Sequence, residues 1–545
     1  MKDGADSAWG HHPGRKARGD GDVDGDRDRD GDGDGDGVAI VGTGPNGLAA
    51  GVTLARAGLR VELYEAAETI GGGLRGEAYF DSEIRHDVCS AVHPMAAASP
   101  FFREFQLAER GVELLNPPVG YAHPVDDGRA GLAYRDLDAT CDALGKDGEP
   151  WRRLMTPLLE HSTGLVEFFM SGQRSLPRDP VAPLLLASRL PAHGTRLGAR
   201  LGARPGSFLG RLLGGFSEEL APALLTGVAA HGVGKLPSVA SASVAMLLGH
   251  LAHGTGWPLP RGGSERIAEV MADDIRAHGG TFHTSTRITD LRQLDGARAV
   301  LLDTTPTQLL ELAGERLPSG YARQLRRFHY GPGAAKADFL VSEPIPWTHP
   351  EVGRAGTVHL GGTRATIARQ EGLTVRGEAT DEPFVLLVDP AATDPGRARA
   401  GKRPVWAYAH VPNGDPRDPV ELLRSRIEKY APGFGDTVVA ARGIPAAEYE
   451  TYNPNYVGGD IGAGAMTLYQ SIARPVPRLD PHRTPLPGVF LCSASTPPGP
   501  GVHGMSGYLA AVSALRHRFG VRSAPSLSPA APAAGAGSAH SSGRF

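Results

Sequence analysis

The sequence predicts an α/β fold in which two domains are built from interleaved segments of one chain. A short β-branched run, Val38 to Val41, breaks into three glycines, and an amphipathic stretch at 48–57 follows at once. Strand, glycine and helix patterns return at 256–310 and at 478–522. Residues 320–475 alternate apolar strands with turns, which predicts a second sheet. A chain of 545 residues is also too long for one simple core.

The segment 38–47 (VAIVGTGPNG) carries the strongest functional signal. A strand, a tight glycine turn and a helix N-terminus together present bare backbone N–H groups to a pyrophosphate. In that arrangement Gly42 makes the turn, Gly44 lets the phosphates approach, and Gly47 lets helix and strand pack closely. The sequence therefore predicts a Rossmann-like dinucleotide-binding domain with a mostly parallel sheet, interleaved with a mixed α+β domain. The predicted binding residues of this turn are Gly42, Gly44, Pro45, Asn46 and Gly47.

Two further segments extend this site. The next predicted strand, Leu59 to Tyr64, ends in Glu65, about 20 residues after the turn, where a carboxylate can accept both ribose hydroxyls. A second glycine turn, 70–75 (IGGGLR), follows and offers a cation near the phosphates. Near the C-terminus a strand at 488–492 leads through a Gly-Pro-rich loop into a predicted helix, 508–518. We interpret this last unit as the closing piece of the same site.

Composition excludes several classes of protein. Hydrophobic content of 41% and charged content of 21% are typical of a soluble globular protein. Cys89, Cys141 and Cys492 form no CxxC pair, which favours a reducing cytoplasm and argues against a disulfide framework or a dithiol enzyme. No window predicts a membrane span, and no signal-peptide pattern is present. We expect no nucleic-acid partner, because the acidity lies in the leader and the rest is near neutral.

Both ends are predicted to be disordered. Residues 1–37 hold eleven Asp against six Lys or Arg, in Gly-Asp repeats with almost nothing to bury. The run 26–31 copies half of a calcium loop, but Gly37 stands where a bidentate Glu is needed, so no metal site is expected. Residues 523–545 are rich in Ala, Ser, Pro and Gly and predict a loose tail.

The predicted domain order follows from these segments. The dinucleotide-binding domain takes three pieces of the chain, at 38–99, 256–310 and 478–522. The substrate domain takes a mostly helical cap at 100–255 and a sheet at 311–477. The acidic leader, 1–37, precedes them and the tail, 523–545, follows.

The chain resembles the two-domain FAD oxidoreductases that include phytoene desaturases and flavin amine oxidases, and within them the phytoene-dehydrogenase-related group. The resemblance runs from about residue 38 to residue 518, nearly all of the predicted ordered chain. Besides the first turn and the C-terminal loop 493–507, it rests on four segments. These are 86–94 (HDVCSAVHP), 256–263 (GWPLPRGG), 330–336 (YGPGAAK) and 453–460 (NPNYVGGD).

The resemblance implies FAD as the cofactor and a role for particular positions. Glu65 would hold the adenosine ribose, and Ile288, in a predicted strand at 281–288, would meet adenine through its backbone. The phosphate and ribityl side would be met by Gly71, Gly72 and Arg75. The isoalloxazine edge would be met by Gly504, Met505 and Ser506.

Three residues are candidates for the chemistry itself. Lys336 matches the lysine that flavin amine oxidases place near N5, where it holds a water; alternatively it pairs with a carboxylate such as Asp338 or Glu343. His86 and His93 stand in one loop beside the expected cofactor. They would contact the ring, orient the substrate, act as acid–base groups, or serve as satisfied structural groups.

The resemblance implies an FAD-dependent oxidoreductase in which a small, apolar organic substrate gives hydride to flavin N5. Reduced flavin would pass electrons to oxygen, a quinone, NAD(P) or another acceptor. The alternatives are a flavin-bound isomerase without net oxidation and a lipid-binding carrier of the Rab escort type.

One cap segment differs from the rest of the chain, because no acidic residue occurs between Asp179 and Glu218. A basic, leucine-bearing surface there would add peripheral membrane contact to a cytoplasmic protein, whereas a solvated loop-helix is the alternative. The basic residues are Arg189, Arg196, Arg200, Arg204 and Arg211.

Overall fold

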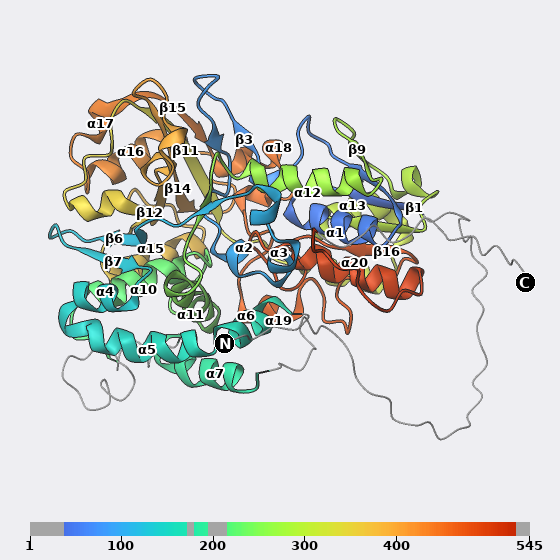
Figure 1. The fold of residues 1–545 in the computed structure, drawn as a ribbon, viewed down its shortest axis with the longest axis horizontal. Helices are drawn as coiled ribbons and strands as arrows, with labels where there is room; N and C mark the ends of the chain where they lie inside the picture. Colours follow the sequence, from blue (N-terminus) through green and yellow to red (C-terminus); the bar gives the residue numbers. More distant parts are fainter. Residues whose placement is uncertain (1–36, 172–178, 195–214, 530–545) are drawn as a thin grey trace, which may run out of the picture.

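The computed structural model describes residues 37–171, 179–194 and 215–529. Within them the chain forms a five-stranded parallel sheet toward the right of Figure 1 and a seven-stranded sheet toward the left. This confirms the α/β class and the Rossmann-like parallel sheet. The acidic leader up to residue 36 lies outside the described residues.

The parallel sheet has the order β16-β10-β1-β2-β9, so its central strands come from distant regions of the chain. Its strands are β1 (Gly37–Val41), β2 (Arg60–Tyr64), β9 (Thr281–His283), β10 (Ala299–Leu302) and β16 (Val489–Leu491). One face carries α1 (Pro45–Arg56), α12 (Glu265–Ala277) and α20 (Met505–Arg518). The other carries α13 (Pro306–Ala313) and α14 (Ser319–Leu325).

Strand β1 shows why this sheet is covered on both faces. Val38 and Ile40 pack in the core that contains α1, while Ala39 and Val41 pack in the core that contains α13 and α14. Successive side chains of a strand point to opposite faces, so a continuous apolar run suits a buried parallel strand. Helix α1 then starts at Pro45, where the missing N–H has no helical partner to lose.

The seven-stranded sheet has the order β15-β11-β14-β13-β12-β6-β7 and is antiparallel except between β12 and β6. Its strands are β6 (Val119–Pro124), β7 (Ala130–Tyr134), β11 (Gly333–Val341), β12 (Ala355–Leu360), β13 (Val385–Val388), β14 (Arg403–Val411) and β15 (Val438–Ile444). Strands β6 and β7 come from the stretch 100–255 that was expected to be mostly helical.

The two faces of this sheet differ in chemistry. On β14, Ala407 and Ala409 pack in an apolar core with α16 (Val420–Glu428) and α17 (Phe434–Thr437). Trp406, Tyr408 and His410 alternate with them and occupy the opposite face. That face is turned toward the parallel sheet and lines one end of the cavity described below.

The remaining elements are short strands and helices around the two sheets. The strands are β3 (Gly76–Glu77), β4 (His86–Asp87), β5 (Leu114–Leu115) and β8 (Leu259–Pro260). The helices are α2 (Pro94–Ala98), α3 (Pro100–Phe105), α4 (Leu137–Ala143), α5 (Gly148–Glu160), α6 (Ser162–Met170), α7 (Val181–Gly194), α10 (Leu220–Ala230), α11 (Val239–His253), α15 (Arg364–Val375), α18 (Tyr449–Tyr452) and α19 (Leu468–Ala473).

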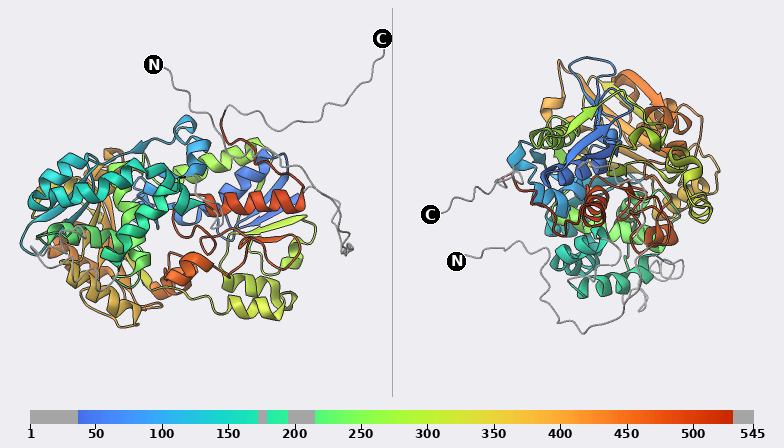
Figure 2. Two further views of the ribbon diagram at one scale, coloured as in Figure 1. Left: turned by 90° about the horizontal axis from the view of Figure 1, so that it is seen from below. Right: turned by 90° about the vertical axis from the view of Figure 1, so that its right-hand side faces the viewer.

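Seen from below, α20 (red) lies beside the blue strands of the parallel sheet, and the teal and green helices gather at the opposite end (Figure 2). Among the described residues no helix combines the length and apolarity that a bilayer span requires. The basic positions from Arg196 to Arg211 lie outside the described residues, as does the Arg189 side chain.

The predicted strand 281–288 is wrong in its second half. Strand β9 ends at His283, because Ser285 has a positive φ of 52° and turns the chain. The backbone N–H groups of Ser285 and Thr286 then donate to the carbonyls of Ala67 and Glu65, both at 2.8 Å. The turn brings the following residues, including Ile288, to the cavity.

The start of the predicted loose tail packs instead against the parallel-sheet domain. Arg56 donates to the carbonyls of Ser526 at 3.1 Å and Ser528 at 2.9 Å, and Arg110 donates to the carbonyl of Leu527 at 3.1 Å. The Leu527 side chain is fully buried. Its burial and these charged donors hold residues 526–528 in place, which composition alone did not indicate.

Replacing Leu527 by Ala should lower the free energy of unfolding by about 2 kcal/mol, because it removes a fully buried side chain. Urea unfolding measures the change. Leu479→Ala is the matched control, since Leu479 is 84% exposed and should change stability by less than about 0.5 kcal/mol. Equal effects of the two substitutions would show that the segment does not contribute to stability.

Candidate functional site

A cavity of about 480 Å³ extends from the glycine turns to the inner face of the seven-stranded sheet. At one end its walls are the loops that leave the carboxyl ends of β1, β2 and β10, where ligands bind in open parallel sheets. At the other end its walls are aromatic and apolar side chains from β13, β14 and α11. One cavity therefore joins a polar, glycine-lined end to an apolar end.

The first glycine turn has the geometry that the sequence predicts. Gly42 has a φ of 95°, which L-residues with side chains rarely adopt. A Cβ on Gly47 would lie 2.2 Å from the Gly42 carbonyl oxygen, so only glycine allows α1 to start so close to the strand. A Cβ on Gly72 would lie 2.9 Å from Cα of Gly44, so the second glycine turn abuts the first.

Glu65 anchors this end of the cavity. Its Oε2 accepts from the Thr43 backbone N–H at 3.1 Å and from the Thr43 hydroxyl. Its Oε1 pairs with Nη2 of Arg75 at 3.1 Å, and both side chains are more than nine-tenths buried. The guanidinium of Arg75 lies 5.1 Å from the ring centre of Tyr452. The acid at the end of β2 and the cation of the second turn thus form one buried pair.

Asp303 is a site residue that the sequence analysis missed. It follows β10, it is 6% exposed, and its Oδ2 accepts from the Gly47 N–H at 3.0 Å. Burial, followed by the nearby Glu65 carboxylate, raises the pKa of Asp303 to about 7. The available signal was an acidic residue directly after the apolar run 299–302, at the carboxyl end of a parallel strand.

Most of the predicted cofactor-binding residues line this cavity. Those that do are Gly42, Gly44, Pro45, Asn46, Glu65, Gly72, Arg75 and Ile288. The others lie just outside the lining and are Gly47, Gly71, Gly504, Met505 and Ser506. The C-terminal loop still reaches the cavity, but through Ser493, Ala494 and residues 500–502. Packing requires glycine at position 507, because a Cβ there would lie 1.8 Å from the Asn46 carbonyl oxygen.

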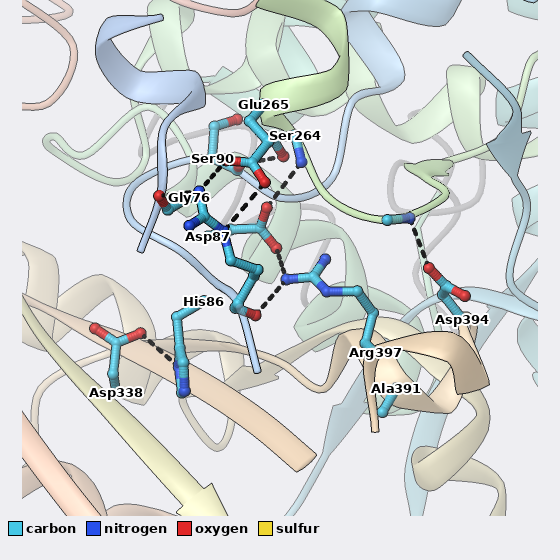
Figure 3. Close-up of polar contacts among 12 residues, drawn as sticks. Gly76, His86, Asp87, Ser90, Ser264, Glu265, Asp338, Ala391, Asp394 and Arg397 are labelled. Atoms are coloured by element: carbon cyan, nitrogen blue, oxygen red, sulfur yellow. Dashed lines mark hydrogen bonds and ion pairs between the residues drawn. The ribbon is translucent and has the colours of Figure 1, made fainter. Parts of the chain in front are cut away.

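Lys336 and His86 lie behind the cavity wall in a buried ionic cluster. The Nζ of Lys336 is 2.6 and 2.7 Å from the two carboxylate oxygens of Asp338, which is one of the partners that the sequence offered. Nδ1 of His86 is 3.3 Å from the same carboxylate (Figure 3). Neither Lys336 nor His86 lines the cavity among the described residues, and their catalytic role stays a prediction.

Asp87 connects this cluster to the parallel-sheet domain, as Figure 3 shows. Its carboxylate accepts from Arg397 at 2.9 Å and from the Ser264 N–H at 2.9 Å. Although burial opposes it, the Arg397 charge and the Ser264 N–H lower the pKa of Asp87 below its ordinary value. Segments far apart in sequence are held together here by charge-assisted hydrogen bonds.

His93 has a structural environment. Its Nε2 is 2.8 Å from the Ser264 hydroxyl, its backbone N–H donates to the Pro258 carbonyl, and its side chain is 1% exposed. Burial lowers the pKa of His93 to about 4, so the ring is neutral at physiological pH. His93 does not line the cavity, although its neighbours Val92 and Pro94 do. Its proposed chemical role also stays a prediction.

The apolar end of the cavity contains residues that sequence reasoning did not select. They come from β13, β14, the loop before β8 and the connection after α10, and include Leu386, Trp406, Tyr408, Trp257 and His231. The alternation of aromatic residues with alanine at 405–410 was the available signal, because it places the aromatic side chains on one face of β14. Which of the two faces meets a ligand depends on contacts distant in sequence.

Comparison with known proteins agrees with this geometry. Residues 40–105 match the family model described as NAD(P)-binding Rossmann-like domain. The chain is similar to the rat pyridine nucleotide-disulfide oxidoreductase domain-containing protein 2, with 24% identity over 541 residues that cover 87% of this chain and 92% of the relative.

Solved structures show the same fold at low sequence identity. A triple mutant of putrescine oxidase superposes with a TM-score of 0.52 at 15% identity, covering 88% of this chain and 97% of that one. A fatty acid isomerase from P. acnes superposes with a TM-score of 0.52 at 13% identity, covering 89% of this chain and 99% of that one.

Proposed function

We propose, from the premise that the chain has the flavin amine oxidase-like fold, that it is an FAD-dependent oxidoreductase resembling the phytoene dehydrogenases. The observation that carries the proposal is the continuity of the cavity, which joins two abutting glycine turns and the Glu65–Arg75 pair to an apolar end. The glycine turns suit a pyrophosphate, and the apolar end suits an organic substrate.

The residues that line the polar end fit FAD. Several of their buried polar atoms have no hydrogen-bond partner within the described regions of the chain, namely Asn46 Oδ1, Arg75 Nε and Thr304 Oγ1. Buried polar groups are normally satisfied, so such atoms suit a bound polar ligand. The turn at Gly42 and Gly44 would hold the pyrophosphate, and Glu65 the ribose. FAD bound here would supply the acceptor for a hydride from a substrate carbon.

The protein's own residues would exclude water and orient the substrate. Trp257, Trp406 and Leu386 are each less than 5% exposed and form a dry wall at the sheet end. Such a wall favours an apolar substrate and strengthens electrostatic interactions at the reacting atoms. The cytoplasmic location belongs to this proposal and fits the three free thiols of the chain.

The purified protein should be yellow, with a flavin absorption band, and anaerobic addition of a reducing substrate should bleach it. The visible spectrum before and after addition measures both results. A flavin-bound isomerase would instead turn over without net bleaching or an external acceptor. The P. acnes neighbour is named as a fatty acid isomerase. A colourless, well-folded sample without flavin would contradict both enzymes and favour a lipid carrier.

A further inference from the structure

The sheet end of the cavity lies in front of four histidines that the proposed function does not use. His123, His359 and His410 stand on the inner face of β6, β12 and β14, and His231 follows α10. Among them only His231 lines the cavity, while the other three are at most 1% exposed. The described residues include no group of three or more metal-ligating side chains placed to hold a metal ion.

His231 is fixed from behind by His359. Their Nε2 atoms are 2.8 Å apart, so one ring donates a hydrogen bond to the other. Trp257 meets the His231 ring edge-on, with ring centres 5.3 Å apart and an interplanar angle of 86°. Burial, followed by the electrostatic influence of His410, lowers the pKa of His231 to about 3. His231 is therefore a neutral, oriented imidazole at physiological pH.

A neutral imidazole paired in this way keeps one nitrogen for a ligand. Each ring carries a single N–H, and Nε2 of His231 is committed to His359. Its Nδ1 forms no hydrogen bond with any of the residues that the structure describes. If His359 donates to His231, this Nδ1 is an N–H donor; if His231 donates, it is an acceptor. A hydroxyl group satisfies either state, and a carbonyl satisfies the first.

No charged side chain at this end is available to a charged ligand, within the residues that the structure describes. The polar groups that the seven-stranded sheet adds to this lining are uncharged: the hydroxyls of Thr357 and Tyr408 and the indole N–H of Trp406. Asp460 also lines the cavity, but its carboxylate accepts from the N–H groups of Gly331 at 2.6 Å, Gly462 at 2.9 Å and Gly464 at 2.9 Å. Burying an ammonium or a carboxylate against such a wall would be costly, because no opposite charge there can pair with it.

We propose that the substrate is an uncharged, largely apolar molecule that carries a hydroxyl or carbonyl oxygen, and that His231 binds this oxygen. The proposal rests on the function proposed above and names the substrate class of the same cavity. It separates this chain from an oxidase that holds a charged amine on a carboxylate.

The selectivity of the unmodified protein tests the proposal first. Trp257 and Trp406 line the cavity, so quenching of tryptophan fluorescence reports binding. The probes are 1-decanol, 2-decanone, decylammonium and decanoate at neutral pH. The alcohol and the ketone should bind at least about tenfold more tightly than either ion, because the ions lose hydration without gaining a counter-charge. Equal or tighter binding of decylammonium or decanoate would overturn the proposal.

Substitution of His231 tests its role directly. His231→Leu removes both ring nitrogens and should weaken 1-decanol binding about fivefold, the effect of one neutral hydrogen bond. His231→Gln keeps a donor and an acceptor and should retain most of the affinity. His517→Leu, on the outer side of α20 where the side chain is 37% exposed, is the control and should bind like the unmodified protein. Unchanged affinity in His231→Leu would overturn the proposal.

The readout also separates this proposal from the function on which it rests. Flavin absorbance of the same sample reports cofactor retention, while the fluorescence titration reports the sheet end with or without flavin. Flavin without selectivity for the neutral probes refutes only the substrate class. Selectivity in a colourless sample refutes the oxidoreductase and supports the His231 site. If His231→Leu does not fold, the titration of His231→Gln and the four-probe series on the unmodified protein test the proposal in its place.

Discussion

Replacement of Gly44 by Val should abolish FAD retention while leaving a folded protein. A Cβ at Gly44 would lie 2.6 Å from Oδ2 of Asp303, which is the movable end of a side chain and not backbone. The chain can therefore accept the substitution by shifting Asp303, but the added methyl groups fill the space where the pyrophosphate would approach the turn. Flavin absorbance relative to protein absorbance after gel filtration measures retention, and it should fall below about one-tenth of the unmodified value.

Gly296→Val is the matched control for this experiment. Gly296 lies in the same domain, is exposed, and would place a Cβ with no atom within 4 Å. It should retain flavin at the unmodified level. Full flavin retention in Gly44→Val, with an unchanged circular dichroism spectrum, would show that the cavity does not bind the cofactor through this turn.

Replacement of Asp303 by Asn should stabilise the protein prepared without cofactor, and should do so more strongly as pH rises. The pKa of Asp303 is raised from 3.8 to about 7 in the folded state, mainly by burial. The folded state therefore favours the protonated carboxyl, and stability falls as pH rises from about 4 to about 7. An amide never ionises and still accepts from Gly47. The expected gain is about 4 kcal/mol at pH 8 and less than about 2 kcal/mol at pH 5.

Urea unfolding at the two pH values measures this difference. Asp295→Asn serves as control, because the Asp295 side chain is 62% exposed and its replacement should change stability by less than about 0.5 kcal/mol at either pH. A gain from Asp303→Asn that is the same at pH 5 and pH 8 would mean that Asp303 ionises normally in the folded protein.

The regions of the fold that follow from local sequence were predictable. The run 38–47 contains a strand, a turn and a helix start in consecutive residues, so its geometry follows from the glycines themselves. Glu65 was found because its distance along the chain from the turn is fixed by one helix and one strand. Both features could be predicted without knowing which residues distant in sequence lie beside them.

The features that depend on long-range contacts were not predictable. Asp303 becomes a site residue because β10 pairs with β1, some 260 positions earlier in the chain. His231 becomes a site residue because α10 packs against β6 and β12, where Gly227 faces His123 and His359. This packing brings the ring of His231 to His359. Lys336 matched a motif of the resembling family, but its neighbour two residues on, Asp338, pairs with it inside the protein. None of these contacts can be read from the order of residues in the sequence alone.

The strand order of the parallel sheet determines when this protein can complete its fold during synthesis. Its central strand β1 leaves the ribosome first, yet its neighbour β10 and the edge strand β16 are translated far later. Residues 526–528, which tether Arg56 and Arg110, come later still. Strand β1 therefore stays unpaired on one side until β10 is made, and β10 is then the open edge of the sheet until β16 follows. Chaperone protection matters most during these two periods.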